Sequence, residues 1–89
     1  MREVDMPRSV VQYHVNEYGY VAVKLAAVMD SRGITRNSLS KLTGSKFDVV
    51  DRYYKGTDVA MVDLDFLARV CYVLNCTITD ILEYRPAGE

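Results

Sequence analysis

The segment from Gly33 to Gly56 constrains the fold more than any other part of the chain. Its sequence, GITRNSLSKLTGSKFDVVDRYYKG, divides at Gly44 into two stretches of helical length. A glycine tolerates the positive φ that lets a chain leave one helix and enter another within a few residues. The segment therefore predicts two short helices joined by a tight turn.

The positive charge of the chain is concentrated around this helix pair. Between Lys24 and Lys55 there are seven Lys or Arg residues against three Asp, whereas Thr57 to Glu89 carries two Arg against six carboxylates. The formal net charge of all 89 residues is only −1. A nearly neutral chain that gathers its cations on a helix-turn-helix pattern has the charge distribution of a nucleic-acid-binding protein.

Length and composition indicate one small globular domain. The chain has 89 residues, of which 49% are hydrophobic and 26% charged, values typical of a single folded domain. Residues such as Lys24 and Arg69 interrupt every apolar run before it reaches the roughly 18 residues of a membrane helix. Because the first residues also lack an apolar signal core, we expect a cytoplasmic protein. The expected units are an arm or strand over residues 1–18, a helical domain over 19–85 and a tail over 86–89.

The sequence contains no recognisable catalytic or metal-binding pattern. It has a single histidine, His14, and no glycine-rich phosphate loop or paired nucleophile and base. Cys71 and Cys76 are too few to form a zinc site with that histidine, and we expect them to be reduced, packed thiols. We therefore expect no enzymatic activity, no metal or other cofactor and no small-molecule substrate.

Helical periodicity begins at Tyr20 and predicts five helices. The apolar face of the first is formed by Val21, Leu25, Val28 and Met29. The residues expected to cap the starts of the other four are Thr35, Ser45, Asp63 and Thr77. The residues expected to end the first four are Gly33, Gly44, Gly56 and Asn75. The inward positions predict a core of Leu25, Met29, Leu39, Leu42, Val50, Leu67, Cys71, Leu74 and Leu82.

These helices resemble those of the lambda-repressor-like, XRE- or Cro-type helix-turn-helix family of phage repressors and Cro proteins. The similarity extends over about Val23 to Tyr84. It rests on RGIT at 32–35, LSKLTG at 39–44, the stop at Gly56 and DLDFLARVCYVLNCTITDILEY at 63–84. The resemblance implies an all-α, five-helix domain with a short N-terminal strand or arm. It also implies a sequence-specific regulator of transcription that binds double-stranded DNA, with repression as the expected role and a phage or mobile element as the expected source.

In this family the third helix enters the major groove and the second lies across the DNA backbone. The resemblance assigns contacts with base edges to Phe47, Asp48, Val49 and Arg52. The expected contacts with phosphate are Arg36, Lys46 and Lys55. Arg52 could bind guanine O6 and N7, and Asp48 could accept from cytosine N4.

The sequence departs from the family pattern at two places. Ser45 and Lys46 stand where the family has an apolar residue followed by a Ser or Thr cap, which predicts a third helix that starts one residue early. Asp48 and Asp51 face phosphates unfavourably, unless one of them reads a base or pairs with Arg52 or Lys55 at helical spacing.

Two alternatives remain open for the partners of the chain. One recognition helix reads few base pairs, so we expect a homodimer. It would be joined by the strand-like arm Ser9–Val15, with Val11, Tyr13 and Val15 on one face. Alternatively, the arm folds back near Glu83 to Arg85 and the last helices make the dimer. The alternative function is a protein-binding module of the same fold, such as an antitoxin, antirepressor or anti-defence partner.

Overall fold

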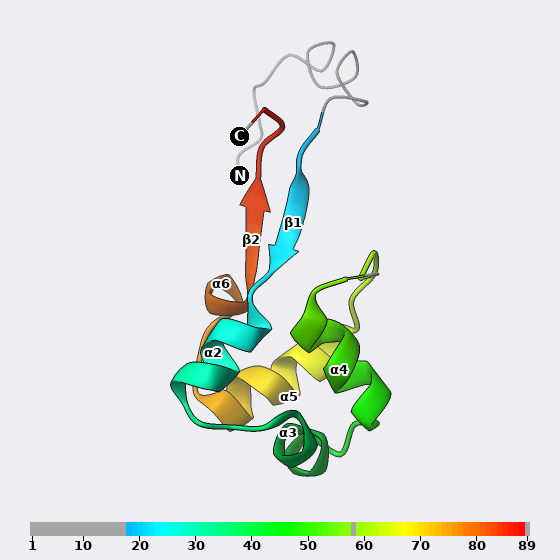
Figure 1. Cartoon of the computed structure of the whole chain (residues 1–89), viewed down its shortest axis with the longest axis vertical. Coiled ribbons are helices and arrows are strands. Elements are labelled where there is room, and N and C mark those ends of the chain that lie inside the picture. The colour runs from blue at the N-terminus through cyan, green and yellow to red at the C-terminus, as the bar shows by residue number, and fades with distance from the viewer. Residues whose placement is uncertain (1–17, 58, 89) are drawn as a thin grey trace.

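The computed structural model describes residues 18–57 and 59–88, and shows a helical body from which a two-stranded ribbon projects (Figure 1). The elements in chain order are β1 (Tyr20–Val23), α2 (Leu25–Ser31), α3 (Arg36–Thr43), α4 (Phe47–Lys55), α5 (Leu64–Leu74), α6 (Ile78–Ile81) and β2 (Leu82–Arg85). The predicted fold of five helices is confirmed. The predicted arm, Ser9–Val15, lies outside the described residues.

Local capping groups set most of the helix boundaries. The Thr35 side chain accepts a hydrogen bond from the Ser38 N–H at the start of α3, and Asp63 accepts one from the Asp65 N–H at the start of α5. Such bonds satisfy backbone donors that have no partner within the helix. Gly44 ends α3 in the left-handed conformation, with φ 71°. Asn75 ends α5 in the same way, with φ 52°.

The helices enclose one hydrophobic core. Six of the nine predicted core residues are buried, namely Leu25, Met29, Leu39, Val50, Leu67 and Leu74. Cys71 and Leu82 are half-buried at its edge. The core residues that the prediction omitted are Val28, Tyr53, Phe66, Val70 and Ile81.

The prediction that Leu42 belongs to the core is wrong, because 59% of this residue is exposed. Leu39 and Thr43 are the buried positions of α3. They are four residues apart and share the face that packs on the core, whereas Leu42 precedes Thr43 by one residue and falls beside that face, toward solvent. The expected cap at Ser45 is also wrong: α4 begins at Phe47 with Lys46 as its N-cap, and no side chain caps it.

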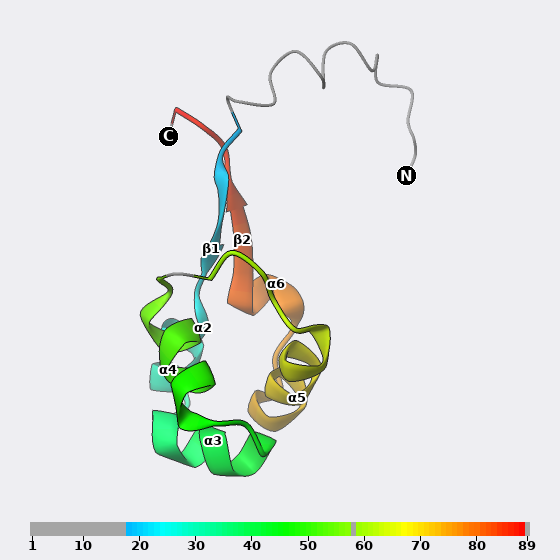
Figure 2. The same ribbon diagram turned by 90° about the vertical axis from the view of Figure 1, so that its right-hand side faces the viewer.

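The ribbon corrects the expectation of a helix from Tyr20. Tyr20–Val23 forms β1, which pairs antiparallel with β2 so that Tyr20 lies opposite Arg85 and Val23 opposite Leu82. The pairing brings the chains very close at Gly19, where an added Cβ would lie 1.7 Å from the Arg85 carbonyl oxygen. Only glycine fits that position. In two perpendicular views the ribbon leaves the body at the end opposite α3 (Figures 1 and 2).

Two arginines tie the helix ends together. The Arg32 side chain donates to the carbonyl oxygens of Leu74 and Asn75 at the end of α5. The Arg69 side chain donates to the Thr43 carbonyl oxygen at the end of α3, at 2.9 Å. Cations at helix C-termini satisfy free carbonyl groups and oppose the helix dipole. Both arginines therefore stabilise the body.

Candidate nucleic-acid interface

The turn between α3 and α4 is held by short hydrogen bonds. The Ser40 hydroxyl donates to the Ser45 carbonyl oxygen at 2.6 Å, and the Ser45 N–H donates to the Ser40 carbonyl oxygen at 3.1 Å. The Thr43 side chain is buried and its hydroxyl donates to the Leu39 carbonyl oxygen at 2.7 Å. These bonds fix the direction in which α4 leaves the turn.

α4 has a buried face and an exposed face. Val50 and Tyr53 are buried in the core, where the ring centroid of Tyr53 lies 4.6 Å from that of Phe66. Val49, one of the predicted base-contacting residues, is half-buried and packs against this core. The exposed side chains of the helix are those of Phe47, Asp48, Arg52 and Lys55. Three of the four predicted base-contacting residues therefore lie on a surface that a ligand can reach.

Asp51 joins two of the predicted phosphate-binding residues. Its carboxylate pairs with Arg36, the first residue of α3, and with Lys55, one turn further along α4, at 3.1 Å. The Arg36 guanidinium also stacks over Tyr54, 4.9 Å from the ring centroid, and lies 5.9 Å from that of Phe47. Cation–π contacts of this kind restrain the guanidinium beyond what the ion pair does. Arg36 is therefore held against α4.

The two cations shift the titration of Asp51. The hydrogen bond from Lys55 is the largest cause that lowers the pKa of this carboxyl below its ordinary value, and Arg36 lowers it further, against the opposing effect of partial burial. The carboxylate is therefore charged at neutral pH. It neutralises part of the positive charge that the sequence places around α4.

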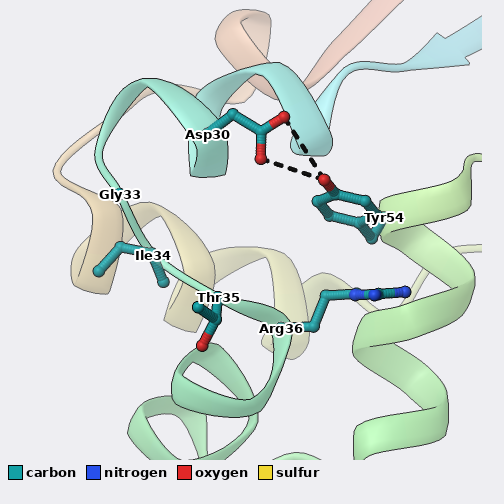
Figure 3. A pocket seen from close by; sticks show the side chains of 6 residues that line it. All are labelled: Asp30, Gly33, Ile34, Thr35, Arg36 and Tyr54. Carbon is teal, nitrogen blue, oxygen red and sulfur yellow. Dashed lines mark hydrogen bonds between the residues drawn. The ribbon is translucent and has the colours of Figure 1, made fainter.

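A hollow of about 370 Å³ lies beside Arg36, between α2, the start of α3 and α4 (Figure 3). The Tyr54 ring lines the side of the hollow next to α4, and its hydroxyl donates to the Asp30 carboxylate at 3.1 Å. That hydrogen bond raises the pKa of Tyr54. The contact ties α4 to the end of α2, so it fixes α4 from the side opposite the turn.

Lys46 and Arg52 complete the set of predicted contacts. Both are exposed, Lys46 at the N-cap of α4 and Arg52 in its last turn. Among residues 18–57 and 59–88, neither forms an ion pair with a carboxylate. The structure thus places the predicted residues on α4, at its N-cap and at the start of α3, and Asp51 joins two of them, Arg36 and Lys55. Helical spacing indicated the pair with Lys55, but the pair with Arg36 spans 15 residues and has no signal in the sequence.

No helix in the described part of the chain is long and apolar enough to cross a membrane. Residues 18–57 and 59–88 also contain no group of three or more His, Cys, Asp or Glu side chains that could hold a metal ion.

Comparison with known proteins places the chain by its family. The family model of the Cro/C1-type HTH DNA-binding domain matches residues 24–87. Among solved structures, the chain is similar to a "putative DNA-binding protein" from Bacteroides fragilis, with a TM-score of 0.63 and 17% identity, over 72% of this chain and 100% of that chain. At that identity the likeness shows a shared fold. No curated protein matches the chain. The family match covers more than half of the residues and includes all five helices, so this chain belongs to the Cro/C1-type helix-turn-helix DNA-binding domain family.

Proposed function

We propose that this protein is a sequence-specific regulator of transcription that binds double-stranded DNA as a homodimer and represses the genes it controls. In this proposal α4 enters the major groove and α3 lies across the backbone. The observation that carries the proposal is the exposed face of α4, which presents both charged and aromatic side chains next to a rigid turn.

Each exposed residue of α4 has a chemical role in the proposed complex. Arg52 is exposed and pairs with no carboxylate among residues 18–57 and 59–88, and its guanidinium suits the O6 and N7 atoms of guanine. Asp48, in the first turn, accepts from cytosine N4, and Phe47 contacts a thymine methyl group. Val49 is half-buried and reaches a base only at the margin of the contact.

The phosphate contacts are assigned to Lys46, Lys55 and Arg36. Lys46 stands at the helix start, where backbone N–H groups also favour an anion. Lys55 and Arg36 both pair with Asp51, so a phosphate must compete with that carboxylate for them. We therefore expect Arg36 and Lys55 to contribute less to phosphate binding than two cations without a carboxylate partner would.

The experiment that tests this function begins with selection of a preferred duplex from random DNA, followed by affinity measurements across a range of salt concentrations. Arg52→Ala should weaken binding to the selected sequence by about 1–3 kcal/mol and relax the preference at one base pair. The matched control is Lys24→Ala, which also removes one cation. Lys24 lies at the base of the ribbon, where its Nζ is 3.8 Å from Oε1 of Glu83. The control should leave the base preference unchanged.

The same test distinguishes a DNA-binding regulator from a protein-binding module of the same fold. A regulator loses affinity steeply as salt rises, because phosphate neutralisation releases counterions. If no duplex is selected and Arg52→Ala changes no DNA affinity, the proposed function fails. A protein partner for the same fold then becomes the better interpretation.

A further inference from the structure

Two cysteines lie on either side of the turn that ends α5. Cys71 is in the last turn of the helix, and Cys76 follows its left-handed end residue, Asn75. The Cys76 N–H donates to the Cys71 carbonyl oxygen at 3.1 Å. This is the bond of the Schellman motif, in which the side chains of the two bonded residues commonly pack together. The backbone at this helix end therefore brings the two cysteines together.

The two thiols are also neighbours. Both cysteines are free, half-buried and packed against the edge of the hydrophobic core. Burial is the largest cause that raises the pKa of the Cys76 thiol above its ordinary value, and the Cys71 thiol beside it raises that pKa further. Each thiol thus has next to it the second sulfur atom that a disulfide needs.

Two charged side chains near the Cys76 thiol act in opposite directions. Arg32 lowers the pKa of this thiol and Asp80 raises it. Both are held by other contacts: Arg32 donates to carbonyl oxygens at the end of α5, and Asp80 accepts from the Thr77 N–H at 2.9 Å. Because the thiolate is the reactive form and Cys76 is mostly protonated at neutral pH, its reaction with an oxidant should be slow. The pair is therefore suited to sustained oxidation.

We infer that Cys71 and Cys76 are a site of reversible oxidation, at which a small disulfide such as oxidised glutathione converts the two thiols to an intramolecular disulfide. One cysteine thiolate attacks the glutathione disulfide, so that a mixed disulfide forms and one glutathione thiolate leaves. The second cysteine thiolate then attacks the protein sulfur of the mixed disulfide and releases the other glutathione. The protein loses two electrons and two protons, and the two glutathione thiols gain them.

The disulfide would lock a helix end that weaker contacts already hold. Arg32 joins the carbonyl oxygens of Leu74 and Asn75 to the residue that follows α2. Neighbouring thiols need little movement to form the bond, so the disulfide should restrict the unfolded chain more than it strains the folded one. Oxidation should therefore stabilise the helical body. The residues proposed to contact DNA lie on α4 and at the start of α3, so this inference stands apart from the proposed function.

The test incubates the full chain with oxidised glutathione, without DNA, and follows intact mass and thermal unfolding. The mass should fall by that of two hydrogen atoms, neither thiol should remain reactive, and dithiothreitol should reverse both changes. The melting temperature of the oxidised chain should lie at least about 5 °C above that of the reduced chain, as expected for a short disulfide loop in a domain of this size.

Cys71→Ser and Cys76→Ser are the matched variants, because each keeps one thiol. Each should stop at the mixed disulfide with glutathione and show no such rise in melting temperature. Circular dichroism before oxidation shows whether the variants retain their helices.

Three results would overturn the inference. The wild-type chain could stop at mixed disulfides, or its disulfides could join two chains. The oxidised wild-type chain could also melt no higher than the reduced chain. These outcomes are decided on the wild-type chain alone, so the inference can be refuted even if a serine variant does not fold.

Discussion

Asp51→Asn should make DNA binding stronger and less selective. Asp51 pairs with both Arg36 and Lys55, so the substitution releases two cations next to α4 at once. The Asn side chain has nearly the same shape, and the Arg36 and Lys55 side chains are themselves 41% and 60% exposed, so loss of the two ion pairs should cost little stability. We therefore expect the fold to persist, with a melting temperature close to that of the wild type.

The size of the effect follows from the number of phosphate contacts. Each contact with duplex DNA adds about 0.9 to the slope of log affinity against log salt, so two released cations should steepen it by roughly 1.8. Between 50 and 200 mM salt, that difference makes the variant lose about 12-fold more affinity than the wild type loses. Phosphate contacts carry no sequence information, so binding to random duplex should gain as much as binding to the selected site.

Fluorescence anisotropy with a labelled selected duplex and a labelled random duplex measures the affinity for each DNA and its dependence on salt. Asp65→Asn is the matched control, because it makes the same change in net charge on α5, where Asp65 pairs with Arg69 at 2.9 Å. An unchanged salt slope in Asp51→Asn would refute the reasoning. A slope that steepens equally in Asp65→Asn would show that net charge, and not the release of Arg36 and Lys55, is responsible.

Three further predictions concern stability. Leu67→Ala should lower the free energy of unfolding by about 2–5 kcal/mol. Leu42→Ala, at an exposed site, should change it by less than about 0.5 kcal/mol. Urea denaturation measures both changes. Gly19→Ala should cost about 1–3 kcal/mol, because its Cβ would overlap the opposite strand, and amide exchange should show a loosened ribbon. The Asp80 carboxylate has its pKa lowered by hydrogen bonds from Thr77, so its contribution to stability is complete at neutral pH and is lost as pH falls below its ordinary pKa of 3.8. In thermal melts of Asp80→Asn, the melting temperature should fall less steeply with decreasing pH than it does in the wild type. An unchanged pH dependence would contradict the assignment.

The helix boundaries could largely be predicted because capping is local. Thr35 and Asp63 each bond a backbone N–H within three residues, so the sequence around the cap contains the whole interaction. Gly44 and Asn75 end their helices through their own backbone conformation. Lys46 is the exception: it starts α4 with no side-chain bond, because the preceding turn is held by Ser40 and Ser45 instead.

The ribbon could not be predicted because its partner strand is remote. Val21 and Leu25 lie four residues apart, which fits a helix as well as a strand that leads into one. Only the pairing of Tyr20–Val23 with Leu82–Arg85, some 60 residues later, decides between them. The similarity to the family, which extended to Tyr84, likewise gave no sign that the chain becomes extended at Leu82.

The charge pattern of the sequence indicated a positively charged surface around α4 but overstated how much of that charge is available to bind phosphate. Among the cations concentrated before Gly56, Arg32 caps α5 and is not part of the exposed face of α4. Arg36 and Lys55 share the carboxylate of Asp51, which leaves Lys46 and Arg52 as the predicted contacts without an ion pair in the described residues. Two such cations make only a modest contribution to the affinity for DNA of any sequence. Most of the affinity in the proposed complex with DNA must therefore come from contacts with base edges.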